Sequence, residues 1–243
     1  MGRFIHKILY RLLSLEGYLR VVSRLFFWTQ RLGIGRYNPA TEYVYHLEKL
    51  VKKGDTAIDI GANLGYYSRT LSRLVGPHGR LYAVEPVPVI LNVLRHNLSS
   101  CRNVEILPYA LGEEQTTIRM ANDTPATNGY FGTGQNHVAK TTAAGSVEFT
   151  AEMRRGSELF ADLDRLDFIK CDIEGYEWIV MSEMRNVLKR FHPTVLIETG
   201  GENRPKIIHF FEILGYEGFM LDHGEEVALD ADTEKDIIFR YKE

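Results

Sequence analysis

The acidic residues Asp59 and Glu85, placed on either side of a glycine turn, could together bind a nucleoside that carries a positive charge. Asp59 lies within the apolar run 56–60 (TAIDI), which has the pattern of a buried parallel strand, and Gly61 and Gly65 follow it. A strand, a glycine turn and a helix bring backbone N–H groups up to an anionic ligand group. Because a carboxylate at this turn opposes a phosphate, Asp59 favours a ligand with a cationic group.

Glu85 lies at the carboxyl end of a second predicted strand, 80–85, and Pro86 ends that strand. It follows Gly61 by 24 residues. In nucleoside-binding α/β sheets, an acid about 20 residues past the glycine turn accepts hydrogen bonds from the ribose hydroxyls. A pair of glycines alone is a weak signal, but with Asp59 and Glu85 in a strand–turn–helix–strand context it predicts nucleoside binding. The alternative is two structural glycines and a solvated acid.

Two further acids, Asp172 and Glu174, alternate at the carboxyl end of a predicted strand at 167–173, where ligands bind in such sheets. Glu174 is the candidate general base for an acceptor hydroxyl, with Glu198 and His137 as further candidates. A free glutamate has a pKa of about 4.3, so proton removal from an alcohol must accompany bond formation. Glu174 could instead be a solvated turn acid or cap the next helix. Asp172 and Glu198 could bind a divalent cation, but no tight acid cluster requires one, and no metal site is predicted.

Three segments together resemble the FkbM-type methyltransferases. They are 59–65 (DIGANLG), Glu85-Pro86, and 167–177 (DFIKCDIEGYE), of which the last is the most specific. The resemblance runs from about residue 41 to about residue 241, and it implies an S-adenosylmethionine-dependent enzyme that methylates hydroxyls of sugars, glycans or natural products. The chain departs from the family pattern at 153–159 (MRRGSEL) and in the Gly-, Thr- and Asn-rich segment 122–147. Both departures lie where an acceptor would be recognised.

The resemblance also implies a set of residues around S-adenosylmethionine. Backbone N–H groups near 63–65 would hold the methionine carboxylate, Asp59 or Asp172 its ammonium group, and Glu85 the ribose. The strand ending near Ala110 would face the adenine. The complete predicted set is Asp59, Gly61, Ala62, Asn63, Gly65, Tyr67, Glu85, Pro86, Ala110 and Asp172.

A loop at 121–145 is too long for a simple connection, and loops of this length are usually functional or disordered. Asn128, Tyr130 and His137, together with Gln135 and Asn136, supply groups that hydrogen-bond hydroxyls. We therefore expect Asn128, Tyr130 and His137 to contact the acceptor. The alternative is a disordered surface segment.

The composition is that of an ordinary globular protein, with 44% hydrophobic and 25% charged residues in a chain of 243. Alternating strands and helices predict a parallel α/β sheet with crossover helices. The resemblance makes this a Rossmann-like, seven-stranded class I methyltransferase sheet with helices on both faces and an antiparallel last strand. Cys101 and Cys171 lack metal-ligand or redox spacing, so reduced thiols and a cytoplasmic location are expected.

The pattern places the regular elements along the chain. Strands are expected at 56–60, 80–85, 104–111, 116–120, 147–152, 167–173, 193–198, 219–221 and 237–241, and helices at 3–31, 41–51, 65–74, 89–98, 177–188 and 204–214. We divide the chain into an N-terminal basic amphipathic helix extension, 1–36, and a methyltransferase domain, 37–243.

The N-terminal extension carries a continuous apolar stripe and most of the basic excess. Residues 1–36 contain seven Lys or Arg and one Glu, whereas the remainder is acidic. The stripe comprises Ile5, Ile8, Leu12, Leu15, Leu19, Val22 and Phe26, at helical spacing. Charged residues interrupt any membrane span or signal peptide. Three interpretations stay open: packing on its own domain or on a second copy in a homodimer, peripheral contact of 3–31 with an anionic membrane at its inner face, or a disordered arm.

Two rival functions remain. A nucleotide-dependent oxidoreductase would require Gly-x-Gly-x-x-Gly after the first strand, and this chain has no middle glycine there. A non-catalytic, membrane-associated scaffold with a relic nucleoside pocket would not need Asp59, Gly61, Gly65 and Glu85 intact. The acidic balance beyond residue 36 does not indicate nucleic acid as a partner, so the expected partner is a small-molecule or glycan acceptor.

Overall fold

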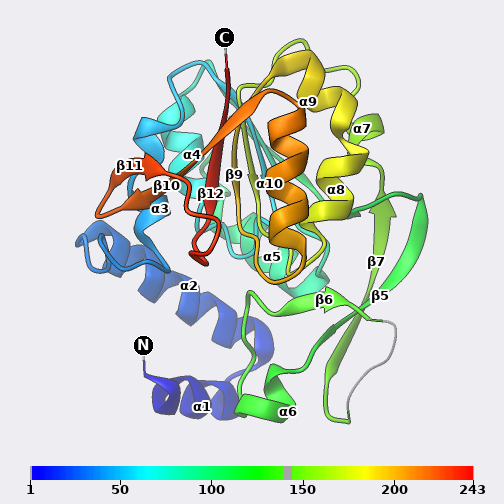
Figure 1. Cartoon of the computed structure of the whole chain (residues 1–243). Coiled ribbons are helices and arrows are strands. Elements are labelled where there is room, and N and C mark those ends of the chain that lie inside the picture. The colour runs from blue at the N-terminus through cyan, green and yellow to red at the C-terminus, as the bar shows by residue number, and fades with distance from the viewer. Residues whose placement is uncertain (1, 140–143, 243) are drawn as a thin grey trace.

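The computed structural model describes residues 2–139 and 144–242, which form a central eight-stranded sheet with helices on both faces (Figure 1). The strand order is β11-β10-β12-β9-β8-β1-β2-β3. The bounds are β1 (Thr56–Ile60), β2 (Arg80–Val84), β3 (Val104–Leu107), β8 (Phe168–Cys171), β9 (Thr194–Ile197), β10 (Tyr216–Asp222), β11 (Glu225–Ala228) and β12 (Ile237–Tyr241).

Neighbouring strands from β3 to β9 pair in parallel, and β12 inserts antiparallel between β9 and β10. The expected parallel sheet with an antiparallel last strand is therefore confirmed. The sheet has one strand more than expected, because β11 forms a hairpin with β10 at the edge. Sequence patterning missed β11, whose short run EEVA is largely exposed.

Alternation along β1 assigns its side chains to the two faces of the sheet. Ile58 and Ile60 pack in a core cluster with α8 (Glu177–Glu183), α9 (Arg185–Phe191) and α10 (Asn203–Ile213). Ala57 points to the other face, toward α4 (Ser68–Val75) and the short helices α3 (Glu42–Tyr45) and η1 (Leu47–Lys49). Helix α5 (Pro88–Asn97) packs on Ala83 of β2. The helix expected at 41–51 is thus two short helices, and the one expected at 177–188 breaks at Met184.

A second, four-stranded sheet carries the insertion that interrupts the alternation of strands and helices, and Figure 1 shows it beside the main sheet. Its order is β4-β7-β5-β6, with β4 (Tyr109–Leu111), β5 (Thr116–Asn122), β6 (Asn136–Val138) and β7 (Val147–Arg154). The prediction of one strand at 104–111 is wrong, because Pro108 separates β3 in the main sheet from β4 in this one. Helix α6 (Thr124–Asn128) follows β5, and α7 (Gly156–Leu159) follows β7.

The N-terminal segment forms two helices, α1 (Arg3–Leu12) and α2 (Leu15–Arg31), instead of the single helix expected at 3–31. Ser14 separates them, because its Oγ accepts a hydrogen bond from Gly17 N at 3.2 Å and caps α2. Tyr18 and Leu19 of α2 are fully buried in a core cluster with α5 and β5, whereas α1 has no buried residue. The predicted stripe is therefore divided: its α2 part packs on this chain's own domain, and its α1 part is exposed.

No helix within the described residues is long and apolar enough to cross a bilayer.

Candidate functional site

The glycine turn after β1 lies directly against the end of β8. Gly61 has φ +79°, and a Cβ at this position would lie 1.9 Å from the carbonyl oxygen of Asp172. Asn63 also has a positive φ, +51°, a conformation that Asn tolerates better than most residues. The side chain of Asn63 is held on both sides, since its Oδ1 accepts from Leu64 N at 2.8 Å and its Nδ2 donates to the carbonyl of Thr133 at 3.0 Å. Only glycine at 61 allows β1 and β8 to end this close together.

Glu85 lies at the carboxyl end of β2, as expected, and it is 5% exposed. Its Oε2 accepts from the backbone N–H of Asn63 and its Oε1 from that of Val87, each at 2.9 Å. Burial raises the pKa of Glu85 to about 7, and these two hydrogen bonds oppose the rise. Each oxygen retains a second lone pair, which can accept a hydrogen bond from a hydroxyl group.

Lys170 of β8 lies between two of the predicted site acids, Asp59 and Asp172. Its Nζ is 3.0 Å from Asp172 Oδ2 and 3.9 Å from Asp59 Oδ1, and it lies 4.9 Å from the centre of the Tyr67 ring. Burial alone would lower the pKa of Lys170, but the charges of Asp172 and Asp59 outweigh it and raise the pKa. Lys170 is therefore a buried ammonium that holds the first turn and the end of β8 together.

Asp59 is completely buried under this ammonium, and Ser68 Oγ donates to its Oδ2 at 2.5 Å. Its Oδ1 has no hydrogen-bond partner among the described residues. Burial raises the pKa of Asp59, while Lys170 and Ser68 lower it. Asp59 is thus enclosed by Lys170 and Ser68, whereas the side chain of Asp172 is partly exposed.

Asp172 and Glu198 share a hydrogen bond at the carboxyl ends of β8 and β9. Burial disfavours the charged form of Asp172, yet Lys170 and hydrogen bonds from Glu198 and Lys170 bring its pKa below the ordinary value. Desolvation and the carboxylate of Asp172 raise the pKa of Glu198. Desolvation and Asp172 also raise the pKa of Asp236, which precedes β12, to about 7. At this edge the acids outnumber the two buried cations that act on them, Lys170 and Arg204.

Glu174 stands in a left-handed turn beyond β8, with φ +54°, and its side chain is exposed to solvent. Gln135 Nε2 donates to its Oε1 at 3.1 Å. Partial desolvation raises the pKa of Glu174 to about 7, and the charges of Asp172 and Glu177 add to the rise. Helix α8 has no side-chain cap, and the turn before it is held by Glu177, whose Oε1 accepts from the backbone N–H groups of Ile173 and Gly175. Glu174 is therefore free of the capping role considered above.

Residues 130–137, which we call the lid segment, lie over the glycine turn and Glu174. Thr133 receives the hydrogen bond of Asn63 and contacts Tyr66, and Gln135 bonds Glu174. At its other end the lid segment is held by the N-terminal helices: the hydroxyl of Tyr18 donates to Phe131 O at 3.0 Å, and His6 stacks on Tyr130 at 4.9 Å. This segment joins α1 and α2 to the predicted site.

The three residues expected to contact the acceptor occupy different places. Tyr130 lies in the lid segment against His6. His137 lies in β6, with Nε2 at 3.7 Å from Asp123 Oδ2, and Asn128 is exposed at the end of α6. The lid segment thus brings Gln135 to Glu174, whereas Tyr130 lies against α1 and His137 is engaged within the second sheet. Residues 140–143 of the predicted recognition loop lie outside the described residues.

The remaining predicted cofactor residues surround the turn or support it. Ala62 and Gly65 close the turn through a hydrogen bond from Gly65 N to Ala62 O at 2.9 Å. The N–H groups at 63–65 that we expected to hold a carboxylate are engaged within this turn, by Glu85, Asn63 Oδ1 and Ala62 O. Pro86 directly follows Glu85, and Ala110 is buried in β4, in the second sheet.

The donor set at this edge of the sheet fits S-adenosylmethionine, which carries an ammonium and a sulfonium charge. Asp172 is ionised at neutral pH beside Lys170, and Glu174 and Asp236, whose pKa values are raised to about 7, add negative charge as they ionise. Glu85 provides a nearly buried carboxylate with acceptor capacity for two neighbouring hydroxyls. Within residues 2–139 and 144–242, no three His, Cys, Asp or Glu side chains are placed to hold a metal ion.

Sequence reasoning missed the roles of Lys170 and Asp236. Lys170 is two residues before Asp172 on the same strand, so period-2 geometry places both side chains on one face. That spacing was a usable signal for a buried ion pair. Asp236 precedes the last strand, and nothing local in the sequence indicates that β12 inserts beside β9 and brings it to the site.

Comparison with known proteins identifies the family and the fold of this chain. The family model described as the Methyltransferase FkbM domain matches residues 59–223. A protein described as "Methyltransferase sdnD" from Sordaria araneosa is 25% identical over 206 residues, which cover 73% of this chain and 79% of that protein. The crystal structure of an FkbM methyltransferase from Methylobacillus flagellatus superposes with a TM-score of 0.53 at 16% identity.

The extent of these matches differs. The superposition covers 79% of this chain and 45% of the Methylobacillus protein, so the chain spans less than half of that structure, and the likeness shows a shared fold. A protein-L-isoaspartate O-methyltransferase from Aeropyrum pernix is 37% identical over 60 residues only, a quarter of this chain and 23% of that protein.

Proposed function

The chain belongs to the FkbM methyltransferase family, and from this premise we propose that it methylates a hydroxyl oxygen of a sugar, glycan or natural-product acceptor. As a member of that family it is an S-adenosylmethionine-dependent methyltransferase. The acceptor atom and the acceptor class are the proposed parts.

Glu174 is the observation that carries the proposal. A hydroxyl must lose its proton as its oxygen is methylated, so the site needs a base that is ionised near neutral pH and reachable from solvent. Glu174 is exposed beyond the carboxyl end of β8, and its pKa is raised to about 7 by partial desolvation and by Asp172. A base with a pKa near the working pH combines an adequate ionised fraction with the strongest drive for proton transfer.

The other residues would bind and align. Glu85 would accept hydrogen bonds from the ribose hydroxyls, and Asp172 would pair with the ammonium group of the donor. When bound, S-adenosylmethionine would supply an electrophilic methyl group for the acceptor oxygen. The proton of the acceptor hydroxyl passes to the Glu174 carboxylate. Alignment of this kind contributes about 7–11 kcal/mol to such reactions, and proton removal about 10²–10⁴ in rate.

The lid segment supports a hydroxyl-rich acceptor. Gln135 brings an amide group directly to Glu174, and Tyr130 places a phenol in the same segment, against His6. Such groups hydrogen-bond to sugar hydroxyls and carbonyls. Closing the lid segment over an acceptor would also exclude water from the reacting atoms.

The test is methyl transfer from methyl-labelled S-adenosylmethionine to a panel of sugars, glycans and polyhydroxylated natural products. Product fragmentation by mass spectrometry then locates the methyl group. We expect the label on a hydroxyl oxygen, with turnover reduced about 10²–10⁴-fold in Glu174→Gln. The control Glu113→Gln changes an exposed glutamate of the β4–β5 connection and should keep full activity. Label found on nitrogen or carbon would refute the proposed acceptor atom.

A further inference from the structure

Exposed apolar side chains gather on the N-terminal helices. Of the thirteen large apolar residues that are exposed within the described chain, ten lie between residues 4 and 37: Phe4, Ile5, Ile8, Leu12, Leu13, Leu25, Trp28, Leu32, Ile34 and Tyr37. The other three, Ile213, Val227 and Tyr241, lie in the C-terminal third of the chain. A concentration of this kind on one segment marks an interaction surface.

Helix α1 arranges its exposed side chains in two parallel rows. Phe4, Ile8 and Leu12 are four residues apart and form the apolar row, with Ile5 beside it. Arg3, Lys7 and Arg11 each precede one member of that row and form a basic row along its flank. The opposite side of α1 is the attached one, where His6 contacts Tyr18 and Tyr130. An apolar row flanked by basic side chains is the pattern of a helix that lies in a membrane interface.

The C-terminal end of helix α2 carries a second group of exposed apolar and basic side chains. Leu25, Trp28 and Leu32 repeat at helical spacing and are exposed, Trp28 by 59%. Arg24 and Arg31 are exposed in the same stretch. Tryptophan and arginine at the edge of an apolar surface are typical of contact with lipid head groups.

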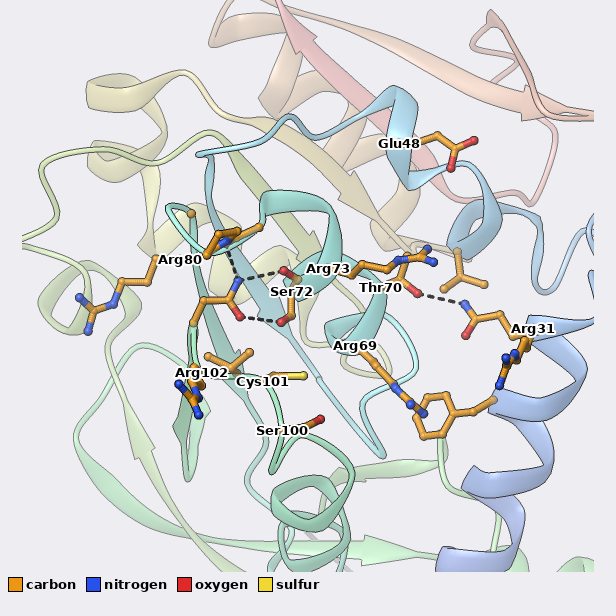
Figure 2. A pocket seen from close by; sticks show the side chains of 18 of the residues that line it. Arg31, Glu48, Arg69, Thr70, Ser72, Arg73, Arg80, Ser100, Cys101 and Arg102 are labelled. Atoms are coloured by element: carbon orange, nitrogen blue, oxygen red, sulfur yellow. Dashed lines mark hydrogen bonds between the residues drawn. The ribbon is translucent and has the colours of Figure 1, made fainter.

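An arginine-lined hollow of about 1460 Å³ borders the same end of α2 (Figure 2). Its walls come from α2, α4 and the segments that precede β2 and β3, at the edge of the sheet opposite the predicted site, and its arginines are Arg31, Arg36, Arg69, Arg73, Arg80 and Arg102. Arg80 pairs with Glu105 at 3.0 Å, and Arg69 lies over the Phe27 ring at 4.7 Å. Within the described chain, the other four form no salt bridge. They can therefore bind phosphate groups.

We propose that α1, the C-terminal half of α2 and this arginine hollow bind the surface of an anionic phospholipid bilayer. The apolar row of α1 and Trp28 enter the interface, and the basic row and the hollow contact lipid phosphates. Residues 1–36 carry seven basic residues and one acid, whereas the rest of the chain has an excess of acidic residues. The anionic bilayer therefore attracts the N-terminal segment and repels the rest of the chain.

Two other occupants fit the observations less well. A nucleic acid would satisfy the arginines but would leave Phe4, Ile8 and Leu12 in water, because phosphate contacts carry its affinity. A second copy of the chain in a twofold dimer would bring the same patch against itself, so the basic residues of the two copies would meet. Only the bilayer accommodates both the apolar row and the basic row.

The test is flotation of the full-length chain with vesicles of phosphatidylcholine alone or mixed with phosphatidylglycerol. We expect binding to the anionic vesicles and little to the neutral ones. Replacing the basic row (Arg3→Gln, Lys7→Gln, Arg11→Gln) should weaken this binding on the order of 100-fold. Replacing the apolar row (Phe4→Ser, Ile8→Ser, Leu12→Ser) should weaken it at least about tenfold. Because α1 has no buried residue, both variants should unfold at the same temperature as the parent.

Matched controls lie on the rest of the chain. Ile213→Ser removes an apolar residue that is 62% exposed, and Lys53→Gln, Lys206→Gln and Lys242→Gln together remove three exposed charges. Neither control should change vesicle binding. In a Trp178→Phe background, Trp28 is the remaining tryptophan, and its emission should shift to the blue on anionic vesicles.

Three results would overturn the proposal. The first is absence of binding to anionic vesicles, or binding that survives both triple replacements. The second is tighter binding to a labelled single- or double-stranded oligonucleotide that the apolar replacements leave unchanged. The third is a dimer in light scattering that the apolar replacements dissociate, which would assign the surface to a second copy.

Discussion

At the scale of single residues, Lys170 determines how the acidic groups of the site share their protons. Its ammonium stabilises the charged form of Asp172, while desolvation, with the charge of Asp172 added, raises the pKa of Glu174 and of Glu198. Asp172 thus stays ionised, whereas Glu174 and Asp236 titrate near neutral pH. A site that binds a cation and also accepts a proton needs both kinds.

The titration of Glu174 gives a pH dependence with a definite sign. A general base works in its ionised form, so activity should be lost as the pH falls through the pKa of Glu174, about 7. We expect kcat to decline about tenfold per pH unit on the acid side of that value. The measurement is a pH profile of methyl transfer for the parent chain and for Glu174→Gln. A profile that keeps the same acid limb in Glu174→Gln would assign the titration to another group.

Sequence patterning identified residue positions better than residue contacts. Glu85, Gly61 and Glu174 lie at strand ends, where they were expected, because these ends follow from local patterns. The engagement of Asp59 by Lys170, and of the turn N–H groups by Glu85 and by the turn itself, depends on how β1, β2 and β8 come together. Such contacts join residues far apart in the chain, and periodicity does not encode them.

At the scale of elements, strands and helices were predicted correctly where a single local sequence pattern defined them. They were predicted wrongly where two patterns, such as apolar spacing and helix capping, pointed to different bounds. The strands β1, β2, β8 and β9 are short apolar runs ending in acids or glycines, and they were found. The helix expected at 3–31 failed because its apolar spacing continues across Ser14, while the capping bond of Ser14 starts a new helix there. β6 was missed because it has only three residues, two of which are polar, and it pairs only with the edge of β5.

Because the N-terminal apolar stripe is buried in α2 and exposed in α1, substitutions in the two helices should change the free energy of unfolding by different amounts. Leu19 is fully buried in a cluster with α5 and the second sheet, so Leu19→Ala should lower the free energy of unfolding by about 2–5 kcal/mol. Leu12 is 77% exposed, so Leu12→Ala should change it by less than about 0.5 kcal/mol. Urea denaturation of both variants makes the comparison. Equal costs would mean that α1 is buried in solution against something that this chain alone does not provide.

At the scale of the whole molecule, buried acids make stability depend on pH. Burial raises the pKa of Glu85 and of Asp236 to about 7 and raises that of Asp59. A carboxyl group with a higher pKa in the folded state binds more protons when folded, so stability falls as the pH rises from the unfolded pKa to the folded one. Asp172, with its lowered pKa, acts in the opposite sense at more acid pH.

We therefore expect the ligand-free chain to be more stable near about pH 5 than near about pH 8, with Glu85 alone contributing about 3 kcal/mol of the difference. Urea denaturation at the two pH values measures it. Glu85→Gln, which has no charge to desolvate, should reduce the difference, whereas the exposed control Glu113→Gln should not. A parent chain that is more stable at the higher pH would show that these acids are not desolvated in solution.

The predicted methyl-transfer site and the arginine hollow of the proposed bilayer surface lie at opposite edges of the sheet. The predicted methyl-transfer site is at the carboxyl ends of the parallel strands, and the arginine hollow is at the opposite ends of β2 and β3. Helices α1 and α2 connect the two, because they form the proposed bilayer surface and also hold the lid segment through Tyr18 and His6. Any change in the position of α1 on a bilayer would therefore act on the lid segment through these contacts.

Titration calorimetry of S-adenosylmethionine binding tests the central claim most directly, namely that the edge formed by β1, β2 and β8 holds the methyl donor. We expect the parent chain to bind, and Glu85→Ala to bind about 1.5–3 kcal/mol more weakly, because it loses hydrogen bonds from the ribose hydroxyls to a charged acceptor. Glu113→Ala, the exposed control, should bind as the parent does. A folded Glu85→Ala that binds S-adenosylmethionine as tightly as the parent chain, or a parent chain that does not bind it, would contradict the account.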